Sequence, residues 1–207
     1  PYAVARAPWL RCAIIVSPPG VNPFEQVTHF LHVQTRSWGL NEEEAEAAEH
    51  MHRAVALYYS GRASYGSAQR VVDRYRNERW FNGVITHPYW DEMSATGKIL
   101  TPPQLREAIA ERPNNFEIYT SDSSFVDYRR LYRSLRRLPT LIIHGEDDEL
   151  LSVDQSRAMF EEILGRSDRH DIWTFAKAGH GVTNAEGAPP PDYLSRMTEW
   201  AVRHLRE

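Results

Sequence analysis

Two segments in the C-terminal third of the chain carry residues that could perform acid–base chemistry together. The first, LIIHGEDDELLS, runs from an apolar stretch into Gly145 and places Asp148 three residues further on. The second, AKAGHGV, places His180 between Gly179 and Gly181. A carboxylate beside an imidazole accepts one ring N–H and stabilises the imidazolium that forms when the other nitrogen takes a proton from a nucleophile. Asp148 and His180 are therefore candidate catalytic residues.

Each candidate follows a segment that is typical of a buried parallel strand. Residues 140–144 (TLIIH) precede Asp148, and residues 170–175 (HDIWTF) precede His180. Helical spacing of apolar residues predicts helices over 153–164 and about 190–205. Open α/β sheets place their active sites just past the carboxyl ends of neighbouring strands. We therefore expect the acid and the histidine to meet at one edge of a sheet.

The rest of the chain adds one strand and a long helical insertion. Residues 12–16 (CAIIV) predict a third buried strand, closed by the turn residues 17–20, and residues 2–8 predict the end of a helix. Residues 23–137 predict helices over 23–38, from the N-cap Asn41 to Gly61, and over 66–78, 103–111 and 125–136, with an irregular aromatic segment at 79–101. The pattern predicts an α/β fold with a parallel sheet, in which residues 1–22 and 138–207 form the core and residues 23–137 form a helical cap.

These features resemble the α/β-hydrolase superfamily, whose triad runs serine, acid, histidine in chain order. The stretch PYAVARAPWLRCAIIVSPPGVNPFEQ is similar to the segment that follows the nucleophile elbow in cap-bearing esterases and serine-aminopeptidase-like hydrolases. The resemblance implies the C-terminal half of such a sheet, with Asp148 as the acid and His180 as the general base. It also implies a small-molecule acyl substrate, such as a carboxylic ester, and no cofactor.

The elbow signature G-x-S-x-G does not occur in the sequence. The nearest pattern, from Gly61 through Ser64 to Gly66, has the wrong spacing and lies between predicted helices. By the family pattern, the serine and the oxyanion-hole donors are expected upstream of Pro1. One hypothesis is thus a serine hydrolase in which this chain supplies the acid and the histidine. The alternative is an inactive fragment or subunit that needs a serine-bearing N-terminal half as its partner.

Several other side chains have both a chemical and a structural interpretation. Asp147 competes with Asp148 for the role of the acid, whereas Glu146 could bind loop amides and His144, at a strand end, could line the site. Cys12 begins a buried strand, where thiols are usually inert. Two histidine pairs lie on predicted helices: His29 and His32 could share a metal ion, whereas His50 and His52 face different directions. An aromatic set could contact substrate: Trp80, Phe81, Tyr89 and Trp90. A run of arginines fits the solvated face of a helix: Arg129, Arg130, Arg133, Arg136 and Arg137.

Composition excludes some classes of protein. The 207 residues are 42% apolar and 25% charged, which is typical of a globular domain. The net charge of −4 argues against a nucleic-acid partner. No apolar run reaches the roughly 20 residues that span a bilayer, which argues against a membrane-spanning protein. Cys12 is the only cysteine, so no intramolecular disulfide forms, and a reducing, cytoplasmic location is slightly favoured.

Overall fold

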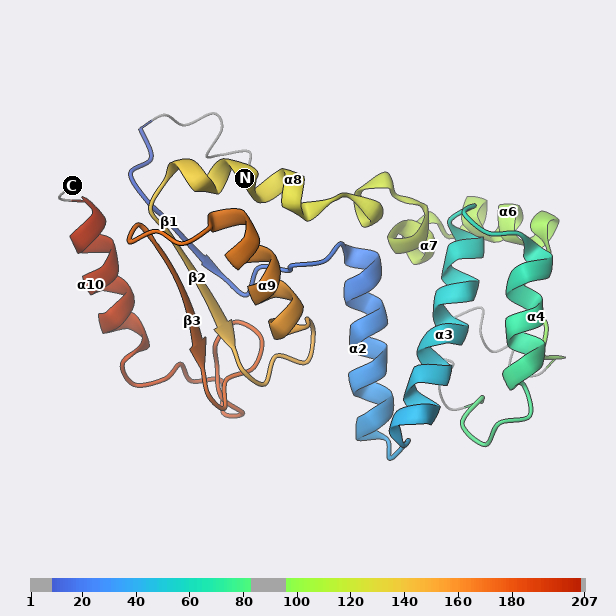
Figure 1. The fold of residues 1–207 in the computed structure, drawn as a ribbon. Helices are drawn as coiled ribbons and strands as arrows, with labels where there is room; N and C mark the ends of the chain where they lie inside the picture. Colours follow the sequence, from blue (N-terminus) through green and yellow to red (C-terminus); the bar gives the residue numbers. More distant parts are fainter. Residues whose placement is uncertain (1–8, 83–95, 206–207) are drawn as a thin grey trace. The chain divides into compact units, whose positions relative to one another are not determined.

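The computed structural model describes residues 9–82 and 96–205 (Figure 1). The predicted helix end at 2–8, and Tyr89 and Trp90 of the aromatic set, lie outside these residues. The chain folds into two compact units. One unit consists of Pro1–Asn22 with Asp127–Glu207, and the other of Pro23–Val126.

The first unit is built on a parallel three-stranded sheet. Its strands are β1 (Ala13–Val16), β2 (Thr140–Gly145) and β3 (His170–Phe175), in the order β1-β2-β3. Their register places Ile14 opposite Leu141, and Leu141 opposite Asp171. The strands that the sequence predicts are present, and the α/β fold class with a parallel sheet is confirmed.

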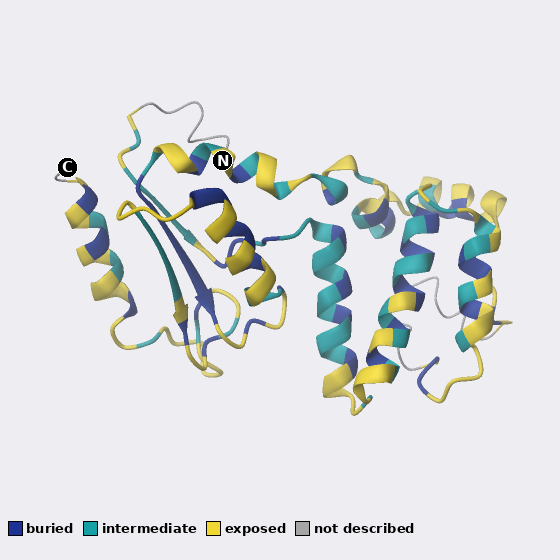
Figure 2. Ribbon diagram, viewed as in Figure 1, coloured by how far each residue is buried: buried dark blue, intermediate teal, exposed yellow. Residues whose placement is uncertain are grey.

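The central strand β2 is buried along its whole length (Figure 2). Ile142 packs into a cluster with Phe160 of α9 (Val153–Leu164), on one face of the sheet. Leu141 packs on the other face with Trp200 of α10 (Tyr193–Leu205). Figure 1 shows the two helices on either side of the strands. A strand covered on both faces needs a continuous apolar run, which explains the sequence TLIIH.

The chain enters β2 through two short helices, α8 (Tyr128–Tyr132) and η2 (Arg133–Arg137). Tyr132 and Leu135 are buried in the same cluster as Phe160 of α9. The helical insertion therefore ends at residue 126. The sequence indicates a later boundary, between residues 137 and 138, so residues 127–137 belong to the unit with the sheet. An amphipathic helix does not reveal from sequence alone which core its apolar face joins.

The second unit is helical and has its own core. Its elements are α2 (Pro23–Ser37), α3 (Glu42–Tyr59), α4 (Tyr65–Tyr75), α6 (Pro102–Glu111), α7 (Pro113–Thr120) and η1 (Asp122–Phe125). Met51, Val55 and Phe116 are fully buried in its apolar cluster. As predicted, Asn41 is the N-cap of α3, where it forms a capping box with Glu44. No strand occurs within residues 23–82 and 96–126.

Helix α7 and the short helix η1 are not predicted by the sequence pattern. The reason is clearest for α7. It begins at Pro113, which could equally have ended the preceding helix α6. Proline is favoured at the first position of a helix because its missing N–H has no helical acceptor there. Phe116 and Tyr119 of α7 are buried, so tertiary packing stabilises this short helix.

Candidate active site

The structure brings Asp148 and His180 together. Asp148 lies in the loop between β2 and α9, and His180 in the loop between β3 and α10. The carboxylate Oδ2 is 2.9 Å from Nδ1 of the imidazole, and Oδ1 is 3.2 Å away from the same nitrogen. Both loops leave the carboxyl ends of adjacent parallel strands, so they lie at the same end of the sheet (Figure 1).

The Asp148 carboxylate is held from its other side by backbone amides. Its Oδ1 accepts hydrogen bonds from the N–H of Leu150 at 2.9 Å and of Leu151 at 3.3 Å. The side chain is fully buried, with 0% exposure. A buried carboxylate with this set of donors is fixed in one orientation, which in turn orients the imidazole.

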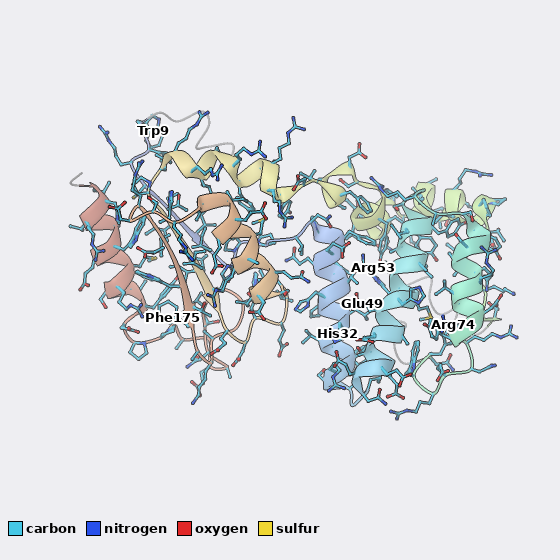
Figure 3. The ribbon with its side chains drawn as sticks, viewed as in Figure 1. Trp9, His32, Glu49, Arg53, Arg74 and Phe175 are labelled. Carbon is cyan, nitrogen blue, oxygen red and sulfur yellow. The ribbon has the colours of Figure 1, made fainter. Side chains whose placement is uncertain are left out.

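The loop that carries His180 is fastened to the neighbouring strands. The amide of Glu146 donates to the carbonyl of Phe175, which Figure 3 labels at the end of β3, and the amide of Asp147 donates to that of Ala178. A Cβ atom on Gly145 would lie 2.2 Å from the Ala178 oxygen. Glycine is required at position 145 because the histidine loop crosses directly over the end of β2.

A third contact that holds the loop comes from Ser17, which directly follows β1 and is buried. Its Oγ accepts a hydrogen bond of 3.1 Å from the amide of Gly181. From the sequence alone, Ser17 has no predicted role beyond its place in a turn. The sequence around Ser17 gives no sign of this hydrogen bond because the partner, Gly181, is 164 residues away along the chain.

The imidazole of His180 remains accessible on its other side. Its side chain is 43% exposed, and its Nε2 has no hydrogen-bond partner within the described ranges 9–82 and 96–205. A cavity of about 360 Å³ lies beside it, with Asp147, Glu149 and Lys177 also in its lining. With Nδ1–H donating to Asp148, Nε2 carries a lone pair that can take a proton from a group in this cavity.

A larger cavity of about 560 Å³ lies at the opposite end of the sheet, beside His170 and Arg166. His170 begins β3, so this cavity is at the amino ends of the strands, where α/β folds do not place catalytic groups. Its lining includes the carboxylate of Glu161 and the imidazole of His170, but no hydrogen bond or ion pair joins these two side chains in the described part of the chain. The chemistry, and not the size of the cavity, marks the site at His180.

The competing acids and His144 have surroundings different from those of Asp148, although Asp147 also lines the cavity beside His180. Glu146 and Asp147 are exposed, and the hydrogen bonds given for them use their backbone amides. His144 is fully buried near the end of β2 against Phe160, and neither ring nitrogen has a hydrogen-bond partner among the residues that the structure describes. Burial, which disfavours the charged form, lowers the pKa of His144 to about 4. A neutral, enclosed imidazole is part of the core.

Two other side chains of the chain could act as nucleophiles, Cys12 and Ser64, and the contacts of both fit a structural role. Cys12 packs against the cluster on the α10 side of the sheet, and burial raises the pKa of its thiol. A raised pKa lowers the fraction of thiolate, which is the reactive form. In the helical unit, Ser64 is the N-cap of α4, where its Oγ accepts from the amide of Ser67.

The histidine pairs of the helical unit do not form a metal site. His32 of α2 lies between Glu42 and Glu49 of α3, at 3.2 and 3.3 Å, and Figure 3 shows it facing Glu49. His50 is exposed beside Tyr75, whereas His52 is buried. Among the residues described, no group of three or more His, Cys, Asp or Glu side chains could hold a metal ion.

The remaining candidates are surface or core residues. The five arginines between positions 129 and 137 are exposed, as predicted for a solvated face. Trp80 and Phe81 are buried in the core of the helical unit. No helix within the described part of the chain is long and apolar enough to cross a membrane.

Comparison with known proteins identifies a family. The model of the prolyl oligopeptidase family matches residues 63–207, which is more than half of the chain and includes both the Asp148 and the His180 loops. Residues 1–62, with β1, lie outside the match. No curated protein and no solved structure matches the chain.

Proposed function

The chain belongs to the prolyl oligopeptidase family, a family of α/β-hydrolases, and on this premise we propose that Asp148 and His180 are the acid and the general base of a serine hydrolase. The substrate is a carboxylic ester or a related acyl compound. The observation that carries the proposal is the hydrogen bond of 2.9 Å between a fully buried carboxylate and Nδ1 of a half-exposed imidazole.

The reaction proceeds through an acyl-enzyme. His180 Nε2 takes the proton of a serine hydroxyl as its oxygen bonds to the acyl carbon, and then gives that proton to the departing alcohol or amine. In the second half, Nε2 takes a proton from water as the water oxygen bonds to the acyl carbon, and it then gives this proton to the departing serine oxygen, which releases the acid and the free serine. Asp148 keeps the proton of Nδ1 in place and stabilises the imidazolium in both halves.

Because the sequence contains no G-x-S-x-G elbow, the nucleophilic serine is assigned to a separate serine-bearing segment, which also supplies the oxyanion-hole amides and joins the sheet at β1. Two features of β1 support this. The strand is apolar yet only half-buried, with Val16 37% exposed, and its outer edge has no strand partner among the described residues. Unpaired apolar edges of parallel strands are ordinarily covered in folded proteins.

Both ester and peptide bonds are compatible with this machinery. The family takes its name from peptidases, and the same triad chemistry hydrolyses amides and esters. Esters react more readily than amides because an alcohol or phenol is a better leaving group than an amine, and p-nitrophenoxide leaves without protonation, so an activated ester is the more sensitive probe.

The second candidate function is that of a non-catalytic subunit, which the same unpaired edge of β1 favours. The two functions differ in what restoring the serine-bearing segment does. A hydrolase half gains activity that depends on His180, whereas a binding subunit gains stability alone.

The test measures hydrolysis of a short p-nitrophenyl ester and of a prolyl p-nitroanilide peptide. The chain is assayed alone and joined to a serine-bearing N-terminal half, with His180→Ala and the exposed His50→Ala as a matched pair. We expect the joined protein to hydrolyse the ester, His180→Ala to abolish turnover and His50→Ala to retain it. Full activity in the His180→Ala variant would refute the proposal.

A further inference from the structure

Ser17 stands at the junction of two elements that meet at the candidate site. It directly follows β1, is 7% exposed, and its amide donates to the carbonyl of Ile143 in β2 at 2.7 Å. Its hydroxyl oxygen accepts the amide of Gly181, the residue after His180. Ser17 is thus tied to the sheet through its backbone and to the histidine loop through its side chain.

Hydrogen bonds hold the histidine loop in place both before and after His180 in the chain. Two residues before His180, the carbonyl of Ala178 accepts the amide of Asp147. One residue after it, the amide of Gly181 donates to Ser17. The first tie fixes the loop to the strand that carries the acid. The hydrogen bond to Ser17 uses a side chain, so a substitution of Ser17 can remove it without changing the backbone of Gly181.

Backbone strain is concentrated around these ties. Among the described residues, three that are not glycine have a positive φ: Ser17 at 46°, Lys177 at 58° and Val182 at 59°. Lys177 and Val182 flank His180 in its loop, and Ser17 is the residue that holds it. A positive φ costs free energy in a residue other than glycine. Such a conformation persists only where the surrounding contacts hold the backbone in it.

We propose that Ser17 is a positioning residue for His180, acting through the amide of Gly181. The hydroxyl holds the loop so that Nδ1 stays within hydrogen-bond distance of Asp148 while Nε2 faces the cavity. This inference rests on the proposed function for its catalytic meaning, but the positioning itself is a property of the folded chain. It can therefore be measured without a substrate.

The experiment follows the Nδ1 proton of His180 by NMR in ¹⁵N-labelled protein, with the signal assigned by its loss in His180→Ala. Ser17→Ala and Ser17→Gly both remove the acceptor. Glycine also relieves the positive φ, so the two variants differ in stability while sharing the same lost bond. We expect exchange of the Nδ1 proton with solvent to accelerate roughly tenfold, and similarly, in both variants because the loop opens more often.

Ser156→Ala is the matched control. Ser156 is 1% exposed, and its Oγ accepts the amide of Gly20 at 2.9 Å, so its loss breaks a bond of the same kind outside the histidine loop. We expect exchange at His180 to stay within about twofold of the native rate in this variant. Unchanged exchange in both Ser17 variants would overturn the inference, as would equal acceleration in Ser156→Ala. Failure of the proposed function is separate, because it shows in hydrolysis and not in proton exchange.

Discussion

The carboxylate of Asp148 lies 2.9 Å from Nδ1 of His180 although the two residues are 32 positions apart in the chain. Their separation is bridged by α9 and β3, and the parallel pairing of β2 with β3 returns the chain to the same end of the sheet. Parallel strands bring successive loops together in this way, so the pair is a direct consequence of the topology.

Asp148→Asn tests the role of this contact. The amide keeps the shape of the side chain, but it no longer bears the charge that stabilises the imidazolium, and it favours the wrong tautomer of His180. In the protein that includes the serine, we expect kcat to fall by about 10³–10⁴-fold, measured by ester hydrolysis.

Asp147→Asn is the control, because it makes the same change at the adjacent, exposed acid. We expect kcat to stay within about threefold of the native value, since the hydrogen bond given for Asp147 uses its backbone amide. A large loss in Asp147→Asn with a small one in Asp148→Asn would mean that the acid has been misassigned between the two neighbours.

Gly145→Ala tests the close approach of the histidine loop to β2. The added methyl group would lie 2.2 Å from the Ala178 oxygen and 2.3 Å from the Gly179 oxygen. Neither atom is part of a flexible side chain, so the loop must shift. We expect a loss of roughly 3 kcal/mol in the free energy of unfolding, measured by urea denaturation.

Gly66→Ala is the comparison for this substitution. Gly66 is exposed in α4, and a Cβ atom there would meet only the end of the Arg70 side chain, at 3.8 Å. Alanine favours helix over glycine, so we expect stability to be unchanged or to rise by less than about 1 kcal/mol. If Gly145→Ala were as well tolerated as Gly66→Ala, the histidine loop would not be fixed against β2.

The capping box of α3 provides a test in the helical unit. Asn41 Oδ1 accepts the amide of Glu44, and the Glu44 carboxylate accepts the amide of Asn41, both at 3.0 Å. We expect Asn41→Ala to lower the thermal stability of this unit by the equivalent of about 1 kcal/mol, measured by calorimetry. Glu43→Ala, in the same turn outside the box, should cost much less; an equal cost would mean that the capping hydrogen bonds of Asn41 contribute no more than a charge in the first turn does.

The sequence predicts the strands, most helices and the acid–histidine pair because each has a local signal. Residues 140–144 form a continuous apolar run, and Asn41 precedes three glutamates. The glycines beside His180 mark a sharp loop. In all these cases the signal lies within a few residues of the element or site that it predicts.

What the sequence does not predict depends on distant partners. Ser17 has no local sign of its bond to Gly181, and α8 has none of its packing on α9. Helix α7 begins at a proline that also fits a helix end. The role of Gly145 is likewise visible only once the backbone of Ala178 has been placed above it.

His144 carries the last prediction, on the pH dependence of stability. Burial lowers its pKa in the folded chain from 6.5 to about 4, although the nearby Asp148 charge opposes this shift. Between these two values the unfolded chain binds a proton that the folded chain excludes. Stability is therefore lost as the pH falls from about 6.5 towards 4, by an amount on the order of 2–3 kcal/mol from this group.

His144→Leu removes this proton linkage while keeping a similar volume against Phe160. Because neither ring nitrogen has a partner within residues 9–82 and 96–205, the substitution breaks no hydrogen bond there, and we expect the variant to be at least as stable as the native chain at pH 7. Urea denaturation at pH 7 and pH 4.5 should show a smaller acid-induced loss in His144→Leu than in the native chain. His50→Leu, at an exposed position, should retain the native loss. An identical loss in the native chain and His144→Leu would mean that His144 is protonated as readily in the folded chain as in the unfolded one, and that β2 is less enclosed than its packing between α9 and α10 implies.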